Sequence, residues 1–563
     1  MTIQEQFEHW ANGYGVIRHS RETELWVHEI LNDLQSQGAK PEYILELLCA
    51  ADKLANAAMW LVVHMTYAEK VKLDGKALSH EDFKDNPQGH TGGSLNMVPA
   101  YVGYMLANAI SGVTRAWLMG QGHAVAAIDS VNLLLDNMRP EHAERYSVSE
   151  FGLTRFVQDF YSYKLDEHGN QDSPLGSHVN INTAGAILEG GYLGFADLQY
   201  VHMPLVGEKL VTFLSDGAFE EQRGSDWVPR WWRPEDSGTV VPIMIFNGRR
   251  IDQRATLSQG KGLEWFKKHL TIYSFDPIEF DGTDPAAFAC MILEGERRLK
   301  DRAEVAQREQ NYPVIMPYGI AVAKKGAGFY GAGTNDAHGL PLGKNPRFDI
   351  QAMEHFNEYA HKMFVPLEKI KKASGIIKNH VVTNRVLERD NLIANREVYI
   401  QNFPKLPYKE VDGNTFDTAH YTLSCPMAGI DQTFLALVEA NADLRPRVGN
   451  PDEMRSNHLN STLDLLKHRV TEAESGVAES INGAVITALN EEAVICACLG
   501  NKAGINLAVT YEAFGPKMLG ALRQEIIWSD HLASRGRKAG WISVPVILTS
   551  NTYENGKNER SHQ

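Results

Sequence analysis

Two stretches, Leu214–Glu220 (LSDGAFE) and Ile243–Ile251 (IMIFNGRRI), decide the fold, because in each an apolar run ends in a polar residue followed by glycine. Residues 209–214 and 240–246 are short, apolar and rich in β-branched residues, which is typical of buried parallel strands. About 25 residues separate the two runs, enough for one crossover connection. Both strands are therefore expected to end at one edge of one sheet, where ligands of open α/β sheets bind.

Asp216 and Asn247 each place a side-chain oxygen at this expected edge. A hard divalent cation such as Mg²⁺ takes few protein oxygens and completes its shell with substrate phosphate. The pair therefore raises the hypothesis of a site that holds a metal and a diphosphate.

The bulk composition is that of a multidomain globular protein. The chain has 563 residues, 43% of them hydrophobic and 22% charged, and two to four domains are expected. Its net charge of −15 argues against a nucleic-acid partner or an anionic membrane surface. No apolar run is long enough to predict a membrane span, and the first residues show no secretory signal.

The five cysteines form no disulfide framework, so a reduced cytoplasmic protein is expected. Cys496 and Cys498, in the run VICACLG, are predicted to be alternate residues of a buried strand.

Along the chain, Gly-rich corners alternate with apolar helices and strands, which predicts doubly wound parallel sheets. Apolar spacing predicts a helical segment over residues 41–70, and residues 115–119 read as a strand. The expected division is a first α/β domain over 1–345, a linker over 346–425 and a second α/β domain over 426–563. The second domain is expected to be incomplete, because no closing helix or strand pattern precedes the last residue.

Four histidines stand beside glycine turns, where backbone and ligand can approach closely. They lie in NPQGHTGGSLN, GQGH, PLGSHVN and DAHGLPL, as His90, His123, His178 and His338. No HExxH or Cys/His spacing predicts zinc, so these histidines suit proton transfer near neutral pH.

The order of these motifs resembles the phosphoketolase family of thiamine-diphosphate enzymes. The resemblance extends through KKGAG, NPDEMRSNHL, TYEAF and TSNTYENGKNERSHQ, from about residue 50 to the last residue. It implies an α/β fold of two thiamine-type domains, a diphosphate-binding domain followed by a pyrimidine-binding domain. It also implies thiamine diphosphate and Mg²⁺ as cofactors, a ketose phosphate as substrate with inorganic phosphate as the second reactant, and a homodimer or higher homo-oligomer.

The resemblance also assigns roles to single residues. Asp216, Asn247 and the backbone carbonyl of Arg249 match the metal ligands. The implied cofactor-binding residues are Gly122, His178, Gly191, Gly217, Lys325 and Glu491. Glu491 matches the glutamate that activates thiamine, although the alignment needs a two-residue gap and leaves Glu492 as its rival. The implied catalytic histidines are His90, His123, His338 and His562, and His458, Lys557 and Asn558 fall in the substrate half of the site.

That substrate half departs from the family. Phe219 brings an aromatic ring into a stretch where the family carries acids, and Arg249-Arg250 replaces a Tyr-Lys pair. His458 stands where an arginine is usual, and Lys557-Asn558 replaces a His-Asn pair. The expected activity is phosphoketolase-type cleavage of a ketose phosphate. A sugar-phosphate 3-epimerase, for instance on xylulose 5-phosphate, a transketolase-like carboligase, and a non-catalytic protein on a degenerate fold are the alternatives.

Overall fold

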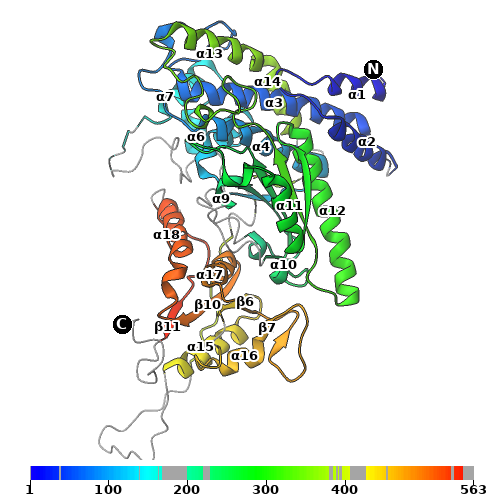
Figure 1. Cartoon of the computed structure of the whole chain (residues 1–563), viewed down its shortest axis with the longest axis vertical. Helices are drawn as coiled ribbons and strands as arrows, with labels where there is room; N and C mark the ends of the chain where they lie inside the picture. The colour runs from blue at the N-terminus through cyan, green and yellow to red at the C-terminus, as the bar shows by residue number, and fades with distance from the viewer. Residues whose placement is uncertain are drawn as a thin grey trace, which may run out of the picture.

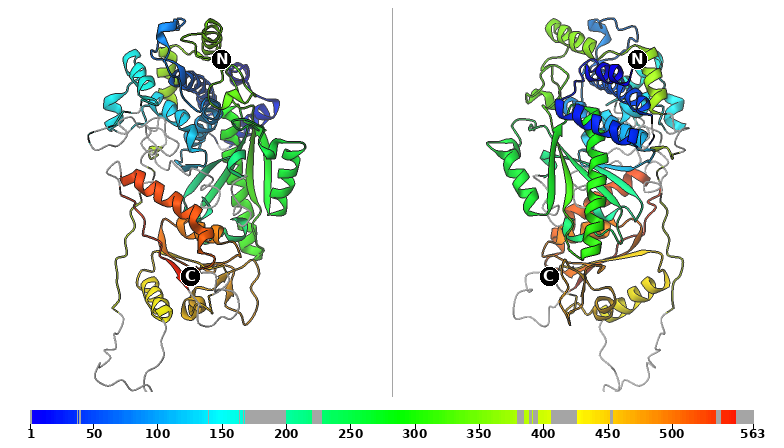
Figure 2. Two further views of the ribbon diagram at one scale, coloured as in Figure 1. Left: turned by 60° about the vertical axis from the view of Figure 1, so that its left-hand side comes forward. Right: turned by 90° about the vertical axis from the view of Figure 1, so that its right-hand side faces the viewer.

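The computed structural model describes residues 2–162 (apart from 37, 39 and 139), 164, 165, 167, 200–219, 228–378, 385–388, 391, 396–405, 426–451, 454–533 and 538–549. They form two α/β units stacked along the long axis of the molecule (Figures 1 and 2). Each unit is built on a parallel sheet, as the alternating pattern predicts.

The first unit holds the sheet β1-β2-β3-β5-β4, in that spatial order, with every pairing parallel. Its strands are β1 (Ala116–Met119), β2 (Lys209–Ser215), β3 (Thr239–Phe246), β4 (Phe275–Asp281) and β5 (Met316–Val322). Its helices are α1 (Ile3–Ala11), α2 (Arg21–Ser36), α3 (Pro41–Tyr67), α4 (Thr91–Ser111), α5 (Val125–Leu134), α6 (Pro140–Arg145), α7 (Glu150–Asp159), α9 (Asp216–Phe219), α10 (Val228–Trp231), α11 (Gly262–Ile272), α12 (Pro285–Glu309), α13 (Ile350–Met363) and α14 (Leu367–Ile377).

The first sheet is buried on both faces, because neighbouring residues of each strand point to opposite sides. Val211 and Val241 join the core formed with α3, α4 and α12, whereas Leu210 and Val240 join the core on the other face. This two-sided burial is why the strands read as continuous apolar runs in the sequence.

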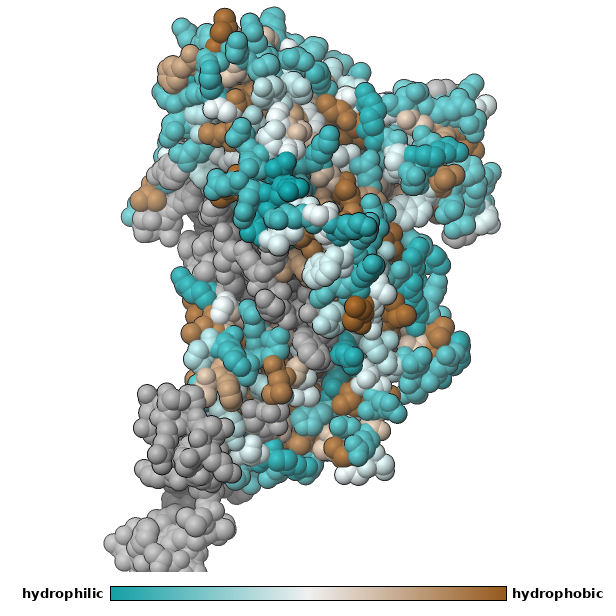
Figure 3. Space-filling model, in the orientation of Figure 1, coloured by the Kyte–Doolittle hydropathy of each residue, from teal (hydrophilic) through white to brown (hydrophobic). Residues whose placement is uncertain are grey.

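Helix α3 is the central helix of the first core. By length and composition it could cross a membrane, and it is the one such helix among the described residues, but 89% of its most apolar window is buried. Helices α13 and α14, which fall in the predicted linker, pack against the same core. The visible face of the molecule is mostly hydrophilic, with hydrophobic residues scattered over it (Figure 3).

The second unit holds the parallel sheet β11-β10-β6-β9-β7-β8 within the described residues. Its strands are β6 (Arg445–Gly449), β7 (His468–Arg469), β8 (Glu479–Ser480), β9 (Val485–Ile486), β10 (Gly504–Tyr511) and β11 (Val546–Thr549). Its helices are α15 (Pro426–Ala440), α16 (Asn460–Leu466), α17 (Glu491–Gly500) and α18 (Leu519–Ala533).

The prediction that Cys496 and Cys498 alternate along a strand is wrong, because both lie in α17. Nearly all of α17 is buried, so its sequence is apolar around the whole helix and lacks a helical period. A short apolar run of this kind cannot be assigned to helix or strand by periodicity alone.

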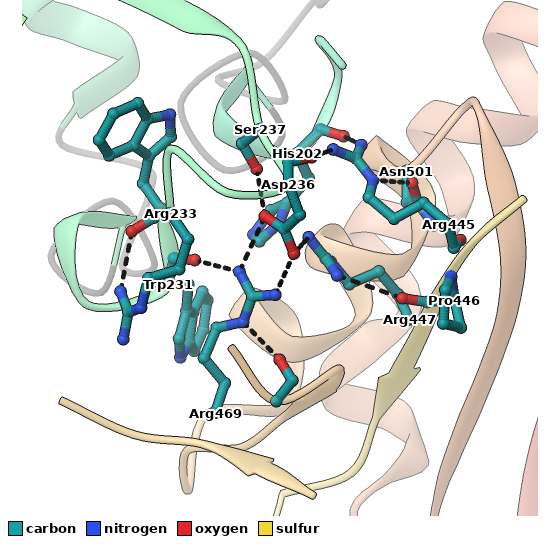
Figure 4. A network of polar contacts seen from close by, with 12 residues as sticks. His202, Trp231, Arg233, Asp236, Ser237, Arg445, Pro446, Arg447, Arg469 and Asn501 are labelled. Carbon is teal, nitrogen blue, oxygen red and sulfur yellow. Dashed lines mark hydrogen bonds and ion pairs between the residues drawn. The ribbon is translucent and has the colours of Figure 1, made fainter. Parts of the chain in front are cut away.

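The two units meet through an apolar core and a group of buried arginines. Ile495 and Leu499 of α17 join the second core of the first unit. Beside them, Arg447 Nη2 donates to Asp236 Oδ2 at 2.7 Å, and Arg469 pairs with the same carboxylate (Figure 4). Arg445 donates to the backbone carbonyl of Asp236 at 2.6 Å. Asp236 is therefore the polar centre of the junction.

Candidate active site

Asp216 and Asn247 lie at adjoining strand ends, as the sequence predicts. Strands β2 and β3 pair in parallel with Ser215 opposite Ile245, and the two polar residues follow directly. The buried carboxylate of Asp216 accepts hydrogen bonds from Gly217 N at 2.9 Å and Gly248 N at 2.6 Å. Burial raises the pKa of Asp216, against the opposing effects of the Gly248 N–H and the Lys325 ammonium.

Lys325 connects this strand edge to a histidine. Its buried ammonium donates to the Arg249 backbone carbonyl at 2.7 Å and contacts His338 Nδ1 at 2.8 Å. Desolvation lowers the pKa of Lys325 to about 8, although the nearby Asp216 carboxylate opposes the shift. Lys325 therefore binds the carbonyl that was predicted as the third metal ligand.

Three of the predicted histidines form one cluster. His90 Nδ1 lies 3.3 Å from His338 Nε2, and the rings of His90 and His123 have centroids 5.1 Å apart. When Lys325 donates to His338 Nδ1, the neutral His338 ring carries its hydrogen on Nε2 and donates it to His90. The cluster thus forms a directed chain of hydrogen bonds from Lys325 to His90.

The glycines after His90 make room for this cluster. A Cβ atom on Gly92 would lie 2.1 Å from the carbonyl oxygen of Ala337, and one on Gly93 would lie 3.2 Å from His123 Nε2. The start of α4 therefore approaches the His338 turn and the His123 ring more closely than side chains allow.

Asn96 positions Lys325, a role that the sequence reasoning did not assign. Its amide nitrogen donates to the Lys324 carbonyl at 2.9 Å, and its amide oxygen accepts from Gly326 N at 3.2 Å. One buried side chain thus holds the backbone on both sides of Lys325. Asn96 belongs to the GGSLN motif, and its place six residues after His90 is the signal that could have drawn attention to it.

The acidic residues of the second unit differ in their environment. Glu491 opens α17 after the N-cap Asn490, is buried, and pairs with Lys517 Nζ at 3.1 Å. Glu492 is half-buried, and burial raises its pKa. The two side chains thus occupy different surroundings, as neighbours on a helix must.

Of the remaining predicted residues, two adjoin the site and one lies in the second unit. Gly122 lies in the short 3-10 turn Gly122–Ala124, which also carries His123, and Gly217 follows Asp216. His458 is exposed in the second unit, in a turn with φ +57°. The predictions on His178, Gly191, Lys557, Asn558 and His562 lie outside the described residues.

The aromatic side chain of Phe219 contacts helix α11. Its ring packs on Phe266 of α11 at a centroid distance of 4.7 Å and on His269 at 5.6 Å. Phe219 therefore adds packing between α9 and α11.

The arrangement places oxygen atoms that could bind a metal next to a hydrogen-bonded set of side chains that could transfer protons. Asp216, Asn247 and the Arg249 carbonyl supply carboxylate, amide and carbonyl oxygens, the ligand types that suit Mg²⁺. Lys325, His338 and His90 can hold or move protons beside them.

Comparison with known proteins identifies the family of this chain. A family profile described as D-xylulose 5-phosphate/D-fructose 6-phosphate phosphoketolase matches residues 429–563, and the profile of the N-terminal domain of the same family matches residues 43–399. "Probable phosphoketolase 2" of Lactiplantibacillus plantarum is 25% identical over 555 residues, which cover 92% of this chain and 67% of that protein. "Probable phosphoketolase" of Schizosaccharomyces pombe is 24% identical over 547 residues, 91% of this chain and 62% of that protein.

The solved structures that resemble the chain include two transketolases. The Campylobacter jejuni enzyme has a TM-score of 0.47 at 13% identity, covering 91% of this chain and 71% of that one. The Leishmania mexicana enzyme has a TM-score of 0.45 at 15% identity, covering 85% and 66%. The chain spans about two thirds of the length of the curated relatives it matches. Since the two family profiles together cover most of its residues, the chain belongs to the D-xylulose 5-phosphate/D-fructose 6-phosphate phosphoketolase family.

Proposed function

We propose that the chain is a thiamine-diphosphate- and Mg²⁺-dependent enzyme that cleaves a ketose phosphate with inorganic phosphate, giving acetyl phosphate and an aldose phosphate. One observation supports this most directly. The strand-end oxygens of Asp216 and Asn247 lie beside the Lys325–His338–His90 chain, so cation-binding and proton-handling groups share one sheet edge.

The donor set fits a magnesium diphosphate. Asp216 and Asn247 would hold the metal together with the Arg249 carbonyl, and all three ligands are hard oxygens. The two backbone N–H groups that bind the Asp216 carboxylate fix it in place. When bound, thiamine diphosphate supplies a nucleophilic carbon and an electron sink for cleavage of the sugar.

The histidines would handle the protons of the sugar hydroxyls. In its neutral form His338 accepts from Lys325 and donates to His90, so a proton that His90 gives to a sugar oxygen can be replaced from Lys325 through His338. Because Lys325 has a pKa of about 8, it can change its charge near neutral pH at little cost.

Glu491 would hold the pyrimidine ring of the cofactor from the second unit. Its place at the buried start of α17 gives a carboxylate in a fixed position, which this role needs. We propose a C₂ homodimer in which this unit of one subunit serves the first unit of the other, the commonest form of oligomer. Light scattering of the active protein should give at least the dimer mass, and an active monomer would contradict the shared site.

Products and cofactor binding test the proposal. The protein is incubated with xylulose 5-phosphate, thiamine diphosphate and Mg²⁺, with and without inorganic phosphate. Acetyl phosphate is expected when phosphate is present. Ribulose 5-phosphate as the product would indicate an epimerase instead, and ketol transfer to an added aldose phosphate would indicate a carboligase.

A variant separates catalysis from loss of the cofactor. Asp216→Ala removes one of few protein oxygens on the metal, so Mg²⁺-dependent binding of thiamine diphosphate should be lost in calorimetry. The matched control is Asp276→Ala, which removes a carboxylate on β4 that pairs with two arginines of α12. This variant should bind thiamine diphosphate as the wild type does. Equal cofactor affinity in the wild type and Asp216→Ala would refute the metal assignment.

A further inference from the structure

The loop after β3 is a tight hairpin with three arginines. Arg249 and Arg254 face each other in an antiparallel bridge, and Arg250 N donates to the Gln253 carbonyl at 2.8 Å. Ser258 Oγ and Ala255 N close the hairpin on the Gly248 carbonyl at 2.9 and 3.0 Å. Gly248 has φ +73°, which allows the chain to turn sharply directly after Asn247. The backbone of Arg249 is therefore fixed at the sheet edge.

The side chain of Arg249 is held next to the histidine cluster. Its Nη1 donates to Asn335 Oδ1 at 3.0 Å, and Asn335 is the N-cap of the turn that carries His338. The backbone carbonyl of the same residue accepts from Lys325. Carbonyl and guanidinium thus have different partners, and the guanidinium reaches the proton-handling side of the site.

This guanidinium has unused hydrogen-bonding capacity. In the part of the chain that the structure describes, it is half-buried and pairs with a neutral amide, and no carboxylate contacts it. By contrast, Arg298 and Arg302 on α12 both pair with Asp276. A guanidinium carries five N–H donors in a planar fork that matches the oxygens of a phosphate.

The surrounding charges favour an anion. Lys325 adds a second cation bonded to Arg249's own carbonyl, on a chain whose net charge is −15. The carboxylate of Asp216, at the end of the neighbouring strand, already accepts two backbone N–H groups and would hold the metal. A local basic site on an acidic protein attracts and orients anions.

We propose that the Arg249 guanidinium binds a phosphate dianion of the reaction, either the ester phosphate of the ketose or free inorganic phosphate. The inference rests on the proposed function and adds a specificity-determining residue to it. Charge-assisted contacts to phosphate are the strong ones, and arginine forms them in pairs.

The test compares Arg249→Gln and Arg249→Lys with wild type, all loaded with cofactor. Arg308→Gln, at an exposed arginine in the last turn of α12, is the control for removing one positive charge. Loss of the guanidinium should raise KM for one phosphate source by roughly 10- to 100-fold, the usual range for a charged hydrogen bond. Arg249→Lys, which keeps the charge but loses the fork, should fall in between. Cofactor affinity should change by less than about threefold.

The KM values for inorganic phosphate and for the ketose phosphate show which of the two phosphates Arg249 binds. A higher KM for inorganic phosphate alone assigns the free ion, and a higher KM for the ketose phosphate alone assigns the ester. Unchanged values for both, or a loss confined to thiamine-diphosphate binding, would overturn the proposal. Arg308→Gln should behave as wild type, and an equal effect there would show a long-range charge effect and also overturn it.

A binding measurement keeps the inference separate from the proposed function. The ³¹P line width of inorganic phosphate is followed as cofactor-loaded protein is added, without sugar, in wild type and Arg249→Gln. If wild type broadens the line, Arg249→Gln does not, and neither cleaves a ketose phosphate, the proposed function fails while Arg249 retains its assignment. If neither KM nor line width depends on Arg249, the assignment itself is wrong, whatever reaction the enzyme performs.

Discussion

The junction between the two units gives the most direct quantitative prediction. Replacing Asp236 by alanine removes the carboxylate shared by Arg447 and Arg469, whose side chains are 1% and 0% exposed. Burial alone would raise the pKa of Asp236, but the two guanidinium groups hold it well below its usual range. The carboxylate is therefore ionised at neutral pH, and its removal leaves buried positive charge without compensation.

The expected cost follows from the type of pair that is broken. Removing one partner of a buried ion pair typically costs 3–5 kcal/mol, because the other charge stays buried. Arg447 and Arg469 keep backbone carbonyl partners, at Pro446 for the first and at Gly483 and Trp231 for the second. We therefore expect about 3 kcal/mol, the lower end of that range.

Asp276, on the edge strand β4, provides a matched control. Asp276 also binds two arginines and has a similar exposed fraction, 28% against 24% for Asp236, but its arginines are 32% and 33% exposed. Asp276→Ala should therefore cost roughly 0–1 kcal/mol, as surface pairs do. The contrast isolates the burial of the arginines as the cause.

Hydrogen exchange at the junction is the assay. The backbone amides of β6, which carries Arg445 and Arg447, should exchange roughly 100-fold faster in Asp236→Ala, since 1.4 kcal/mol corresponds to a factor of ten. Amides of α3, in the core of the first unit, should be unaffected. Equal protection of β6 in Asp236→Ala and Asp276→Ala would refute the view that this carboxylate stabilises the junction.

Two further predictions concern single side chains. Burial of His19 lowers the pKa of its imidazole, but hydrogen bonds to Asp284 (2.9 Å) and Asp52 (3.2 Å) outweigh this effect. The pKa of His19 is therefore raised to about 10, above its unfolded value of about 6.5. His19→Gln should therefore lower the free energy of unfolding by its full amount at about pH 6.5 and below, and the deficit should shrink between pH 6.5 and 10; a difference independent of pH in denaturant titrations would contradict the charged state. Glu491→Gln should slow exchange of the thiazolium proton of bound cofactor by orders of magnitude, as NMR can measure, whereas Glu492→Gln should have little effect; the reverse order would assign the role to Glu492.

The positions of the strand-end residues could be predicted because a parallel sheet aligns its strand ends. The runs at 209–214 and 240–246 identify β2 and β3, and topology then places Asp216 beside Asn247 without knowledge of any side-chain contact. The histidine cluster was predicted only as a set of candidates. Its geometry depends on how closely α4 approaches the His338 turn, and glycine spacing indicates such an approach without specifying the partner.

The buried arginines could not be predicted, because Asp236, the residue that all three contact, is more than 200 residues distant in the chain. Arg445 and Arg447 are two residues apart on β6, so both side chains lie on the face of the strand that meets the first unit. From the sequence alone, however, two such arginines are expected to be exposed at the surface. Burial became favourable through Asp236 and several backbone carbonyls, which tertiary packing supplies. The same limitation explains Asn96 and Asn335, whose amides act on residues that only the folded chain brings near.

The strand order also explains which loops carry the site. His123 follows β1, Asp216 follows β2, Asn247 and Arg249 follow β3, and Lys325 follows β5, and these four strands are contiguous in the sheet. The edge strand β4 borders only β5 and supplies no candidate residue. A site assembled from consecutive strand ends can change one loop without moving the others, since each loop is anchored by its own strand. Arg249 illustrates this independence, because its carbonyl is bound to Lys325 while its side chain reaches Asn335.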